Sequence, residues 1–239
     1  MEESEIDIKE LIVIGGSSGS LMVFFDILNN IPDRFPLAVL LIIHRGNFLE
    51  SMLLNLLALK SRLPVKEVEE KEKIKPSHVY LAPADYHVLI EKDKTFSLDY
   101  SEKLNFSRPS IDISFISAAS VYGKKLTGIL LSGANNDGAE GLKEIKGRGG
   151  HTIIQDPEDA VVNYMPKQAI LKSRIDQVLT TEKIKQYLIS LSHPGFACAV
   201  QRWSGSTKPT GFTRKGAFRS NSPRSTRASC TRAKSKFGR

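Results

Sequence analysis

The sequence has 239 residues, of which 41% are hydrophobic and 25% are charged, and its formal net charge is +8. This composition is typical of a globular protein, and it excludes a collagen-like fibre, a disulfide scaffold and disorder of the whole chain. A basic chain could bind nucleic acid or a membrane surface, but the positive charge is confined to one end. Residues 193–239, which we call the tail, hold 11 of the 34 Lys and Arg residues and no acidic residue. The other 23 basic and all 26 acidic side chains lie in residues 1–192, whose net charge is therefore −3.

Residues 1–192 are enough for one domain with its own core and too few for two. Ser, Thr, Arg, Lys, Gly and Pro dominate the tail without a sustained apolar period, so we expect a disordered extension there. Both cysteines, Cys198 and Cys230, lie in the tail, so the domain has no disulfide. Its apolar runs fall well short of the ~20 residues that a membrane-spanning helix needs. The N-terminus is acidic and unlike a signal peptide, so we expect a cytoplasmic protein.

Short apolar runs alternate with segments of helical spacing along the domain. In chain order we expect a strand at 11–14, a helix at 21–28, a strand at 37–43, a helix at 48–59, a strand at 79–82, a hairpin of strands 87–90 and 95–98, a helix at 111–121, a strand at 126–131, a helix at 139–145, a strand at 151–154, a short helix opened by Pro166 and another capped by Thr181 or Glu182. Continuous apolar strands that alternate with amphipathic helices are typical of a parallel sheet covered on both faces. We therefore predict an α/β fold with a doubly wound, mainly parallel sheet, helices on both faces and a small antiparallel hairpin.

Three strand exits are polar and rich in glycine, and ligands in such folds bind at the carboxyl ends of the strands. Ser17 lies in Gly15-Gly-Ser-Ser-Gly19, a G-x-S-x-G pattern between a strand and a helix. His44 ends the second strand, and Asp137 lies in the turn before a later helix. A serine, a histidine and an aspartate at one edge could form a nucleophile, a base and the carboxylate that orients the base.

Each of these residues also has an interpretation without catalysis. The Gly/Ser turn could bind phosphate or be purely structural, His44 could simply be packed, and Asp137 could cap a helix. The chain order Ser…His…Asp differs from the Ser…Asp…His order of α/β-hydrolases. The alternative functions are a phosphate- or nucleotide-binding module without enzymatic activity and a degenerate receptor-binding scaffold. A nucleotide site is disfavoured because the turn lacks the P-loop lysine and the third glycine of a dinucleotide fingerprint.

A series of blocks along residues 8–190 resembles the catalytic domain of the chemotaxis protein-glutamate methylesterases, the CheB family. The blocks are Ile14-Gly-Gly-Ser-Ser-Gly-Ser20, Ile42-Ile-His44, Val79-Tyr-Leu-Ala-Pro-Ala-Asp85 with His87, Arg108-Pro-Ser-Ile-Asp112 with Ser117-Ala-Ala119, Leu130-Leu-Ser-Gly-Ala-Asn-Asn-Asp-Gly-Ala139, and Ile154-Gln-Asp156 with Tyr164-Met-Pro166. Their common order is more specific than any one motif.

The resemblance implies a serine hydrolase that removes methyl groups from glutamate γ-methyl esters on chemoreceptors, and that in many relatives also deamidates glutamines. It implies that Ser17 is the nucleophile, His44 the general base and acid, and Asp137 the residue that orients His44. Backbone N–H groups near Ser17 and Ser18 are the expected oxyanion donors. The implied partners are the cytoplasmic helices of methylated receptors and water, without nucleic acid and with the membrane reached only through the receptor. No cofactor or metal is expected, since the five histidines form no close cluster with Cys or carboxylates.

The chain departs from the family pattern at several positions. Ser18 stands where the family usually has Thr, and Gly19-Ser20 stands in place of a Gly-Gly pair. Gly133-Ala134-Asn135 replaces the common Gly-Met-Gly, which removes an apolar wall from the expected site. No proton-transferring residue is lost. Because the first strand begins by about residue 11, we expect a stand-alone domain without the receiver domain of typical relatives.

Five other features have weaker interpretations. His87 could line the cleft or be structural, and Arg108 could contact an acidic receptor surface or be a solvated surface residue. His78 and His151 are not expected to be ligands. The charged run 66–75 is expected to be a solvated face.

Overall fold

The computed structural model describes residues 11–44, 50–105 and 107–192, and the tail lies outside them. A seven-stranded sheet forms its centre, and every neighbouring pair of strands in it is parallel. The strands, in the order in which they pair, are β3 (Val65–Glu67), β4 (Val79–Leu81), β2 (Ala38–Ile43), β1 (Leu11–Gly16), β7 (Leu126–Leu130), β8 (His151–Gln155) and β9 (Gln177–Leu179). The predicted hairpin is a separate antiparallel pair, β5 (His87–Ile90) and β6 (Phe96–Asp99).

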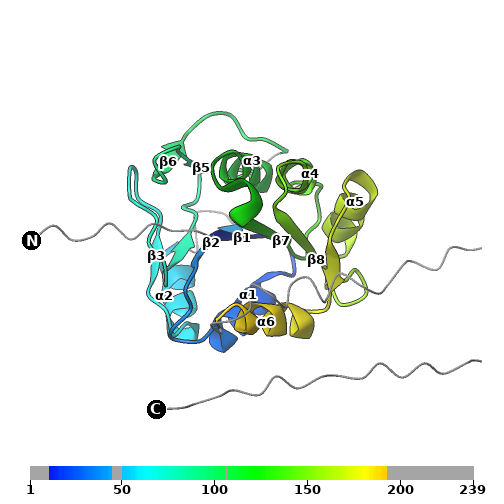
Figure 1. The fold of residues 1–239 in the computed structure, drawn as a ribbon, viewed down its shortest axis with the longest axis horizontal. Coiled ribbons are helices and arrows are strands. Elements are labelled where there is room, and N and C mark those ends of the chain that lie inside the picture. Colours follow the sequence, from blue (N-terminus) through cyan, green and yellow to red (C-terminus); the bar gives the residue numbers. More distant parts are fainter. Residues whose placement is uncertain (1–10, 45–49, 106, 193–239) are drawn as a thin grey trace, which may run out of the picture. The chain divides into compact units, whose positions relative to one another are not determined.

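Helices cover both faces of the sheet, as Figure 1 shows. The helices are α1 (Leu21–Asn30), α2 (Glu50–Lys60), α3 (Ile111–Tyr122), α4 (Ala139–Gly147), α5 (Tyr164–Lys172) and α6 (Thr181–Ser190), and a short 3-10 turn, η2 (Gly123–Lys125), follows α3. One face carries α1, α2 and α6, and the other carries α3, α4 and α5. The predicted α/β fold with a doubly wound parallel sheet is confirmed.

Alternating side chains of the strands build one hydrophobic core on each face of the sheet. Leu11 and Val13 of β1 join the cluster that contains Phe115 of α3. Ile12 and Ile14 of the same strand join the cluster that contains Phe24 of α1. Because both faces of the central strands are buried, these strands are apolar without a break, which is the pattern that made them recognisable in the sequence.

The order of the strands fixes where a site can form. From β1 the chain moves outward to β2 and β4 on one side, and it later returns to place β7 on the other side. Such a reversal of direction leaves a crevice outside the carboxyl ends of the central strands. In register, Gly16 of β1 lies opposite Ile43 of β2, so the residues that follow these strands, Ser17 and His44, leave the sheet side by side.

Several predicted boundaries need correction. The two edge strands, β3 and β9, have three residues each and were not predicted. The helix attributed to Pro166 begins two residues earlier, at Tyr164. The cap of α6 is Thr180, whose hydroxyl accepts a hydrogen bond from the amide of Lys183, rather than Thr181 or Glu182.

The charged run 66–75 is only partly the solvated face that was expected. Lys66 forms ion pairs with Glu69 and Glu72 at 3.0 Å each, but Val68 and Ile74 from the same run lie buried in the core. Among the described helices, none is long and apolar enough to span a membrane.

Candidate active site

Ser17 lies in the tight turn between β1 and α1, and several hydrogen bonds hold the backbone of this turn in place. The Ser17 amide donates to the carbonyl oxygen of Ser132 at 2.9 Å. The Ser17 carbonyl accepts from the amide and the hydroxyl of Ser20, at 3.0 and 2.6 Å. The Ser132 hydroxyl donates to the carbonyl of Ser18 at 2.8 Å. Ser17 therefore lies just before α1, on a turn whose backbone is held by Ser132 of the segment that follows β7.

Gly16 makes this turn possible. A Cβ at this position would lie 2.7 Å from both Cβ and Oγ of Ser20, closer than real Cβ atoms come. Gly19 has a φ of +81°, a backbone conformation that residues other than glycine rarely adopt. Ser20, which stands where the family usually has glycine, fits here because its hydroxyl turns back onto the Ser17 carbonyl.

His44 and Asp137 are in direct contact. Nε2 of His44 lies 2.8 Å from Oδ2 of Asp137, and the His44 amide donates to the carbonyl of Gly16 at 3.2 Å. Asp137 is completely buried, and the His44 side chain is 10% exposed. The structure thus brings the three predicted site residues, Ser17, His44 and Asp137, to the carboxyl edge of neighbouring strands.

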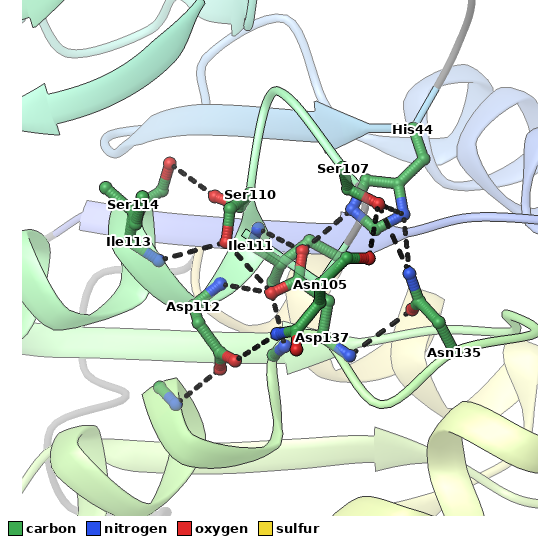
Figure 2. A network of polar contacts seen from close by, with 12 residues as sticks. His44, Asn105, Ser107, Ser110, Ile111, Asp112, Ile113, Ser114, Asn135 and Asp137 are labelled. Carbon is green, nitrogen blue, oxygen red and sulfur yellow. Dashed lines mark hydrogen bonds and ion pairs between the residues drawn. The ribbon is translucent and has the colours of Figure 1, made fainter. Parts of the chain in front are cut away.

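The N-terminus of α3 surrounds the Asp137 carboxylate with donors (Figure 2). The amides of Ile111 and Asp112 donate to it at 2.7 and 3.0 Å, and the Ser110 hydroxyl donates at 2.9 Å. Burial alone would raise the pKa of Asp137, but the hydrogen bonds from His44 and from the backbone amides outweigh it and hold the pKa below its usual value. Asp137 is therefore a carboxylate at neutral pH. The alternative interpretation of Asp137 as a helix cap is wrong, because the residue that precedes α4 is Gly138.

The ionised Asp137 accepts hydrogen bonds only, so Nε2 of His44 carries the proton between them. A neutral imidazole then has its lone pair on Nδ1. Two polar groups lie at Nδ1, the Ser107 hydroxyl at 3.3 Å and the Asn135 amide nitrogen at 3.5 Å (Figure 2). In this structure Nδ1 is the nitrogen of His44 that can accept a proton.

The expected oxyanion donors need a correction. The Ser17 amide is engaged by Ser132, so it is not available to an oxyanion in this arrangement. Of the two expected positions, Ser18 remains, at the exposed tip of the turn.

The Gly133-Ala134-Asn135 segment shows what replaces the common family pattern. A Cβ on Gly133 would lie 2.4 Å from the terminal methyl carbon of Met165, so a side chain here would require this buried methionine of α5 to move. Ala134 is exposed and Asn135 is half-buried beside His44. The side of the site where the family commonly has methionine is therefore occupied by a small residue followed by a polar one.

A second buried carboxyl group, Asp112, lies behind Asp137. It accepts a hydrogen bond from the amide of Gly141 in α4 at 2.7 Å and faces the Asn105 amide nitrogen at 3.4 Å. Burial is the main cause that raises the pKa of Asp112, to about 7, and the charge of Asp137 acts in the same direction. In the sequence, Asp112 stands out only as the last residue of the block Arg108-Pro-Ser-Ile-Asp112, and no role could be predicted for it.

Two residues with open interpretations have structural roles. His87 is fully buried, its Nδ1 accepts from the Ser110 amide at 3.0 Å, and its Nε2 faces the Glu102 carbonyl at 3.0 Å. Arg108 is not solvated, because its side chain is only 11% exposed. Its guanidinium lies 3.8 Å from the centroid of the Tyr100 ring and donates to the carbonyls of Tyr100 and Ser101.

Within the part of the chain that the structure describes, no group of three or more His, Cys, Asp or Glu residues could hold a metal ion. Nδ1 of His78 donates to the Pro76 carbonyl at 2.8 Å, and His151 stacks on the Tyr187 ring. Ser107 could not be identified as part of the site, because an isolated serine in a loop carries no pattern, and Ser110 stood within the block Arg108-Pro-Ser-Ile-Asp112 without a role of its own.

Comparisons with known proteins identify the family. Residues 12–188 match the family model described as CheB methylesterase. A protein of Leptospira interrogans (serovar copenhageni) is 46% identical over 182 residues, which cover 76% of this chain and 94% of that protein. Its name gives it, provisionally, the activities of a protein-glutamate methylesterase and a protein-glutamine glutaminase. A relative from Carboxydothermus hydrogenoformans, named protein-glutamate methylesterase/protein-glutamine glutaminase 1, is 39% identical over 183 residues, or 74% of this chain and 54% of that protein. The chain therefore spans nearly all of the first relative and about half of the second.

A solved structure agrees in fold. The crystal structure of the Thermotoga maritima CheB methylesterase catalytic domain superposes with a TM-score of 0.74 at 36% identity, covering 77% of this chain and 100% of that one. The chain belongs to the CheB methylesterase family.

Proposed function

We propose that this protein is a serine hydrolase that removes methyl groups from glutamate γ-methyl esters of chemoreceptors and also hydrolyses glutamine side-chain amides. One observation supports this most directly: the buried Asp137 carboxylate holds Nε2 of His44 at 2.8 Å beside the Ser17 turn. Relatives that match most of this chain carry names with both activities. The receptor helices would reach the protein from the cytoplasm, and the membrane takes part only through the receptor.

The reaction begins at Ser17. Nδ1 of His44 takes the proton from Oγ of Ser17 while Oγ attacks the ester carbonyl carbon. The tetrahedral intermediate collapses when Nδ1 returns this proton to the methoxy oxygen, and methanol leaves. Water then gives a proton to Nδ1 and attacks the acyl-enzyme. Nδ1 returns this proton to Oγ of Ser17 as the second tetrahedral intermediate collapses, which releases glutamate and restores Ser17 and the neutral His44.

Asp137 supports the step in which His44 becomes an imidazolium. The charge of the carboxylate stabilises the positive ring, and the Nε2 hydrogen bond keeps the Nδ1 lone pair directed away from Asp137. The α3 amides keep the carboxylate ionised and fixed in place. We assign the Ser18 amide as one oxyanion donor, since it lies in the turn two residues before the N-cap of α1, and the dipole of that helix favours negative charge at this end.

A serine-reactive phosphonate probe tests the assignment of the nucleophile. We expect the probe to label Ser17 and expect His44→Ala to abolish the labelling. His78→Ala is the matched control, because His78 is half-buried and bonds through Nδ1 to the Pro76 carbonyl, away from Asp137. Absence of labelling in the unsubstituted protein, together with tight nucleotide binding, would instead favour a phosphate-binding module.

A further inference from the structure

We propose that Asn135 makes this site prefer methyl esters to carboxamides, because its side chain offers a hydrogen-bond donor at the point where the leaving group departs. The inference rests on the proposed function and names the feature that sets the balance between its two activities. It concerns a residue that stands in the loop between β7 and α4 and carries no assigned role in the reaction derived above.

The position of Asn135 follows from the contacts of His44. In the collapse of the tetrahedral intermediate, Nδ1 must give its proton to the leaving atom, so that atom lies within hydrogen-bonding distance of Nδ1. Nδ2 of Asn135 already lies 3.5 Å from Nδ1, and Ser107 Oγ lies 3.3 Å from it (Figure 2). Both side chains therefore border the place of the leaving atom.

The orientation of the Asn135 amide is determined by its other contacts. Its Oδ1 accepts a hydrogen bond from the Asp137 backbone amide at 3.3 Å, so the oxygen faces away from His44. Its Nδ2 donates to Ser107 Oγ at 3.3 Å and directs its second hydrogen toward Nδ1. Asn135 can thus only donate at this place.

The two leaving groups differ in the lone pairs they offer. When Nδ1 is protonated it no longer accepts from Asn135, and the Nδ2 hydrogen needs another acceptor. The methoxy oxygen of the ester intermediate has two lone pairs, so it accepts from both Nδ1 and Asn135. The amine nitrogen of the amide intermediate has a single lone pair, which Nδ1 uses. Its own hydrogens then face the Asn135 donor, and this donor stays unpaired.

An unpaired donor in a partly enclosed site slows the reaction that leaves it unpaired. Asn135 is half-buried, so we expect a modest selectivity of about 5- to 10-fold in favour of the ester, at the low end for a lost hydrogen bond. The neighbouring hydroxyl of Ser107 can donate or accept, so it does not discriminate between the two leaving groups.

The test compares two substrates that differ only at the leaving group. A purified chemoreceptor cytoplasmic fragment would carry either glutamate γ-methyl ester or glutamine at the same position, and methanol or ammonia release would give kcat/KM for each. Asn135→Ala removes the donor, so the ester-to-amide ratio of kcat/KM should fall about 5- to 10-fold. Asn135→Asp places an acceptor there, which can pair with the amine hydrogens, so the ratio should fall further.

Controls separate this selectivity from effects on folding. Both activities are measured on one preparation, so the folded fraction cancels in the ratio. Asn136→Ala changes the adjacent asparagine of the same loop and should leave the ratio unchanged. An unsubstituted protein that releases methanol, with a ratio that Asn135→Ala and Asn135→Asp do not lower, overturns the role of Asn135 alone. An unsubstituted protein that acts on neither substrate overturns the proposed function as well.

Discussion

The behaviour of His44 depends on which of its nitrogens faces the carboxylate. Here Nε2 faces Asp137 and Nδ1 is the proton acceptor, with Ser107 and Asn135 beside it. In the well-known serine proteases the ring is used the other way round, with Nδ1 toward the carboxylate. The chemistry is the same, because either nitrogen can serve when the other is held by an acceptor.

Replacing Asp137 by Asn tests its electrostatic role. The variant keeps a side chain of the same size but loses the charge that stabilises the His44 imidazolium, so we expect kcat to fall by about 10³–10⁴-fold. Methanol release under saturating substrate measures this. Asp33→Asn, an exposed aspartate in the loop after α1, is the control and should keep full activity. A decrease in Asp137→Asn of less than tenfold would contradict the role assigned to Asp137.

The placement of Ser17, His44 and Asp137 at one edge of the sheet could be predicted from the sequence, because each follows an apolar strand that ends in a polar or glycine-rich exit. The contacts that other residues make with these three could not be predicted from the sequence. Asn135 approaches His44 only because β7 and β2 flank β1, and the engagement of the Ser17 amide by Ser132 is likewise a tertiary contact.

At the scale of elements, the N-terminus of α3 and the first turn of α4 meet at two buried carboxyl groups. Asp137 lies at the start of α3, and Asp112 of α3 accepts from Gly141 of α4. A Cβ on Gly141 would lie 2.5 Å from Cβ of Phe115, so the two helices pack too closely there for a larger residue. The site is thus supported by a helix pair that tolerates little change.

The pH dependence of stability should reveal the raised pKa of Asp112. Its pKa is about 7 in the folded protein, against about 3.9 for an unfolded aspartate. Between these values the folded state holds a proton that the unfolded state has lost, so this group lowers the free energy of unfolding as the pH rises. Asp112→Asn should make the free energy of unfolding decrease less steeply between about pH 4 and pH 7. Urea denaturation across this range measures it, and an unchanged slope would show that Asp112 ionises normally.

Asp137 has the opposite effect on the pH dependence of stability, and it acts over a lower range of pH. Its lowered pKa contributes stability that is present above the unfolded value of about 3.9 and is lost as the pH falls through the folded pKa. The two carboxyl groups therefore contribute to separate parts of the same stability curve.

Gly138 joins the Asp137 turn to α4 and should not tolerate a side chain. Its φ is +94°, and a Cβ would lie 2.6 Å from Cδ1 of Leu130. Gly138→Ala should lower the free energy of unfolding by about 2 kcal/mol through backbone strain and this contact. Gly147→Ala is the control, because nothing lies within 4 Å of a Cβ built there. Equal stability of the two variants would contradict the strained conformation of Gly138.

The elements that the sequence predicted are those with long apolar patterns. Strands such as β1 and β2 are buried on both faces and apolar throughout. The edge strands β3 and β9 have three residues each and expose part of their side chains, so they show neither an apolar run nor an alternation. Their pairing is decided by the neighbouring strand and not by their own residues.

At the scale of the whole molecule, the charge of +8 divides between a domain of −3 and a tail of +11. The family match covers residues 12–188 and ends before the tail begins. The strands, helices and site described above all lie within residues 11–192.

Deletion of residues 193–239 tests whether the tail contributes to catalysis. Since each residue placed in the reaction lies in the domain, we expect the shortened protein to keep kcat/KM within about twofold of the full chain, too little to reflect a lost transition-state contact. Methanol release by both proteins, at equal concentrations of folded domain, measures this. A large loss of activity would show that the tail takes part in the reaction or in binding the receptor.

Methanol release from a methylated chemoreceptor fragment tests the central claim most directly. The unsubstituted protein should release methanol in proportion to the glutamate γ-methyl esters present, and Ser17→Ala and His44→Ala should each reduce the release to background. Release that persists in Ser17→Ala, or no release by the unsubstituted protein, would contradict a methylesterase that works through Ser17, His44 and Asp137.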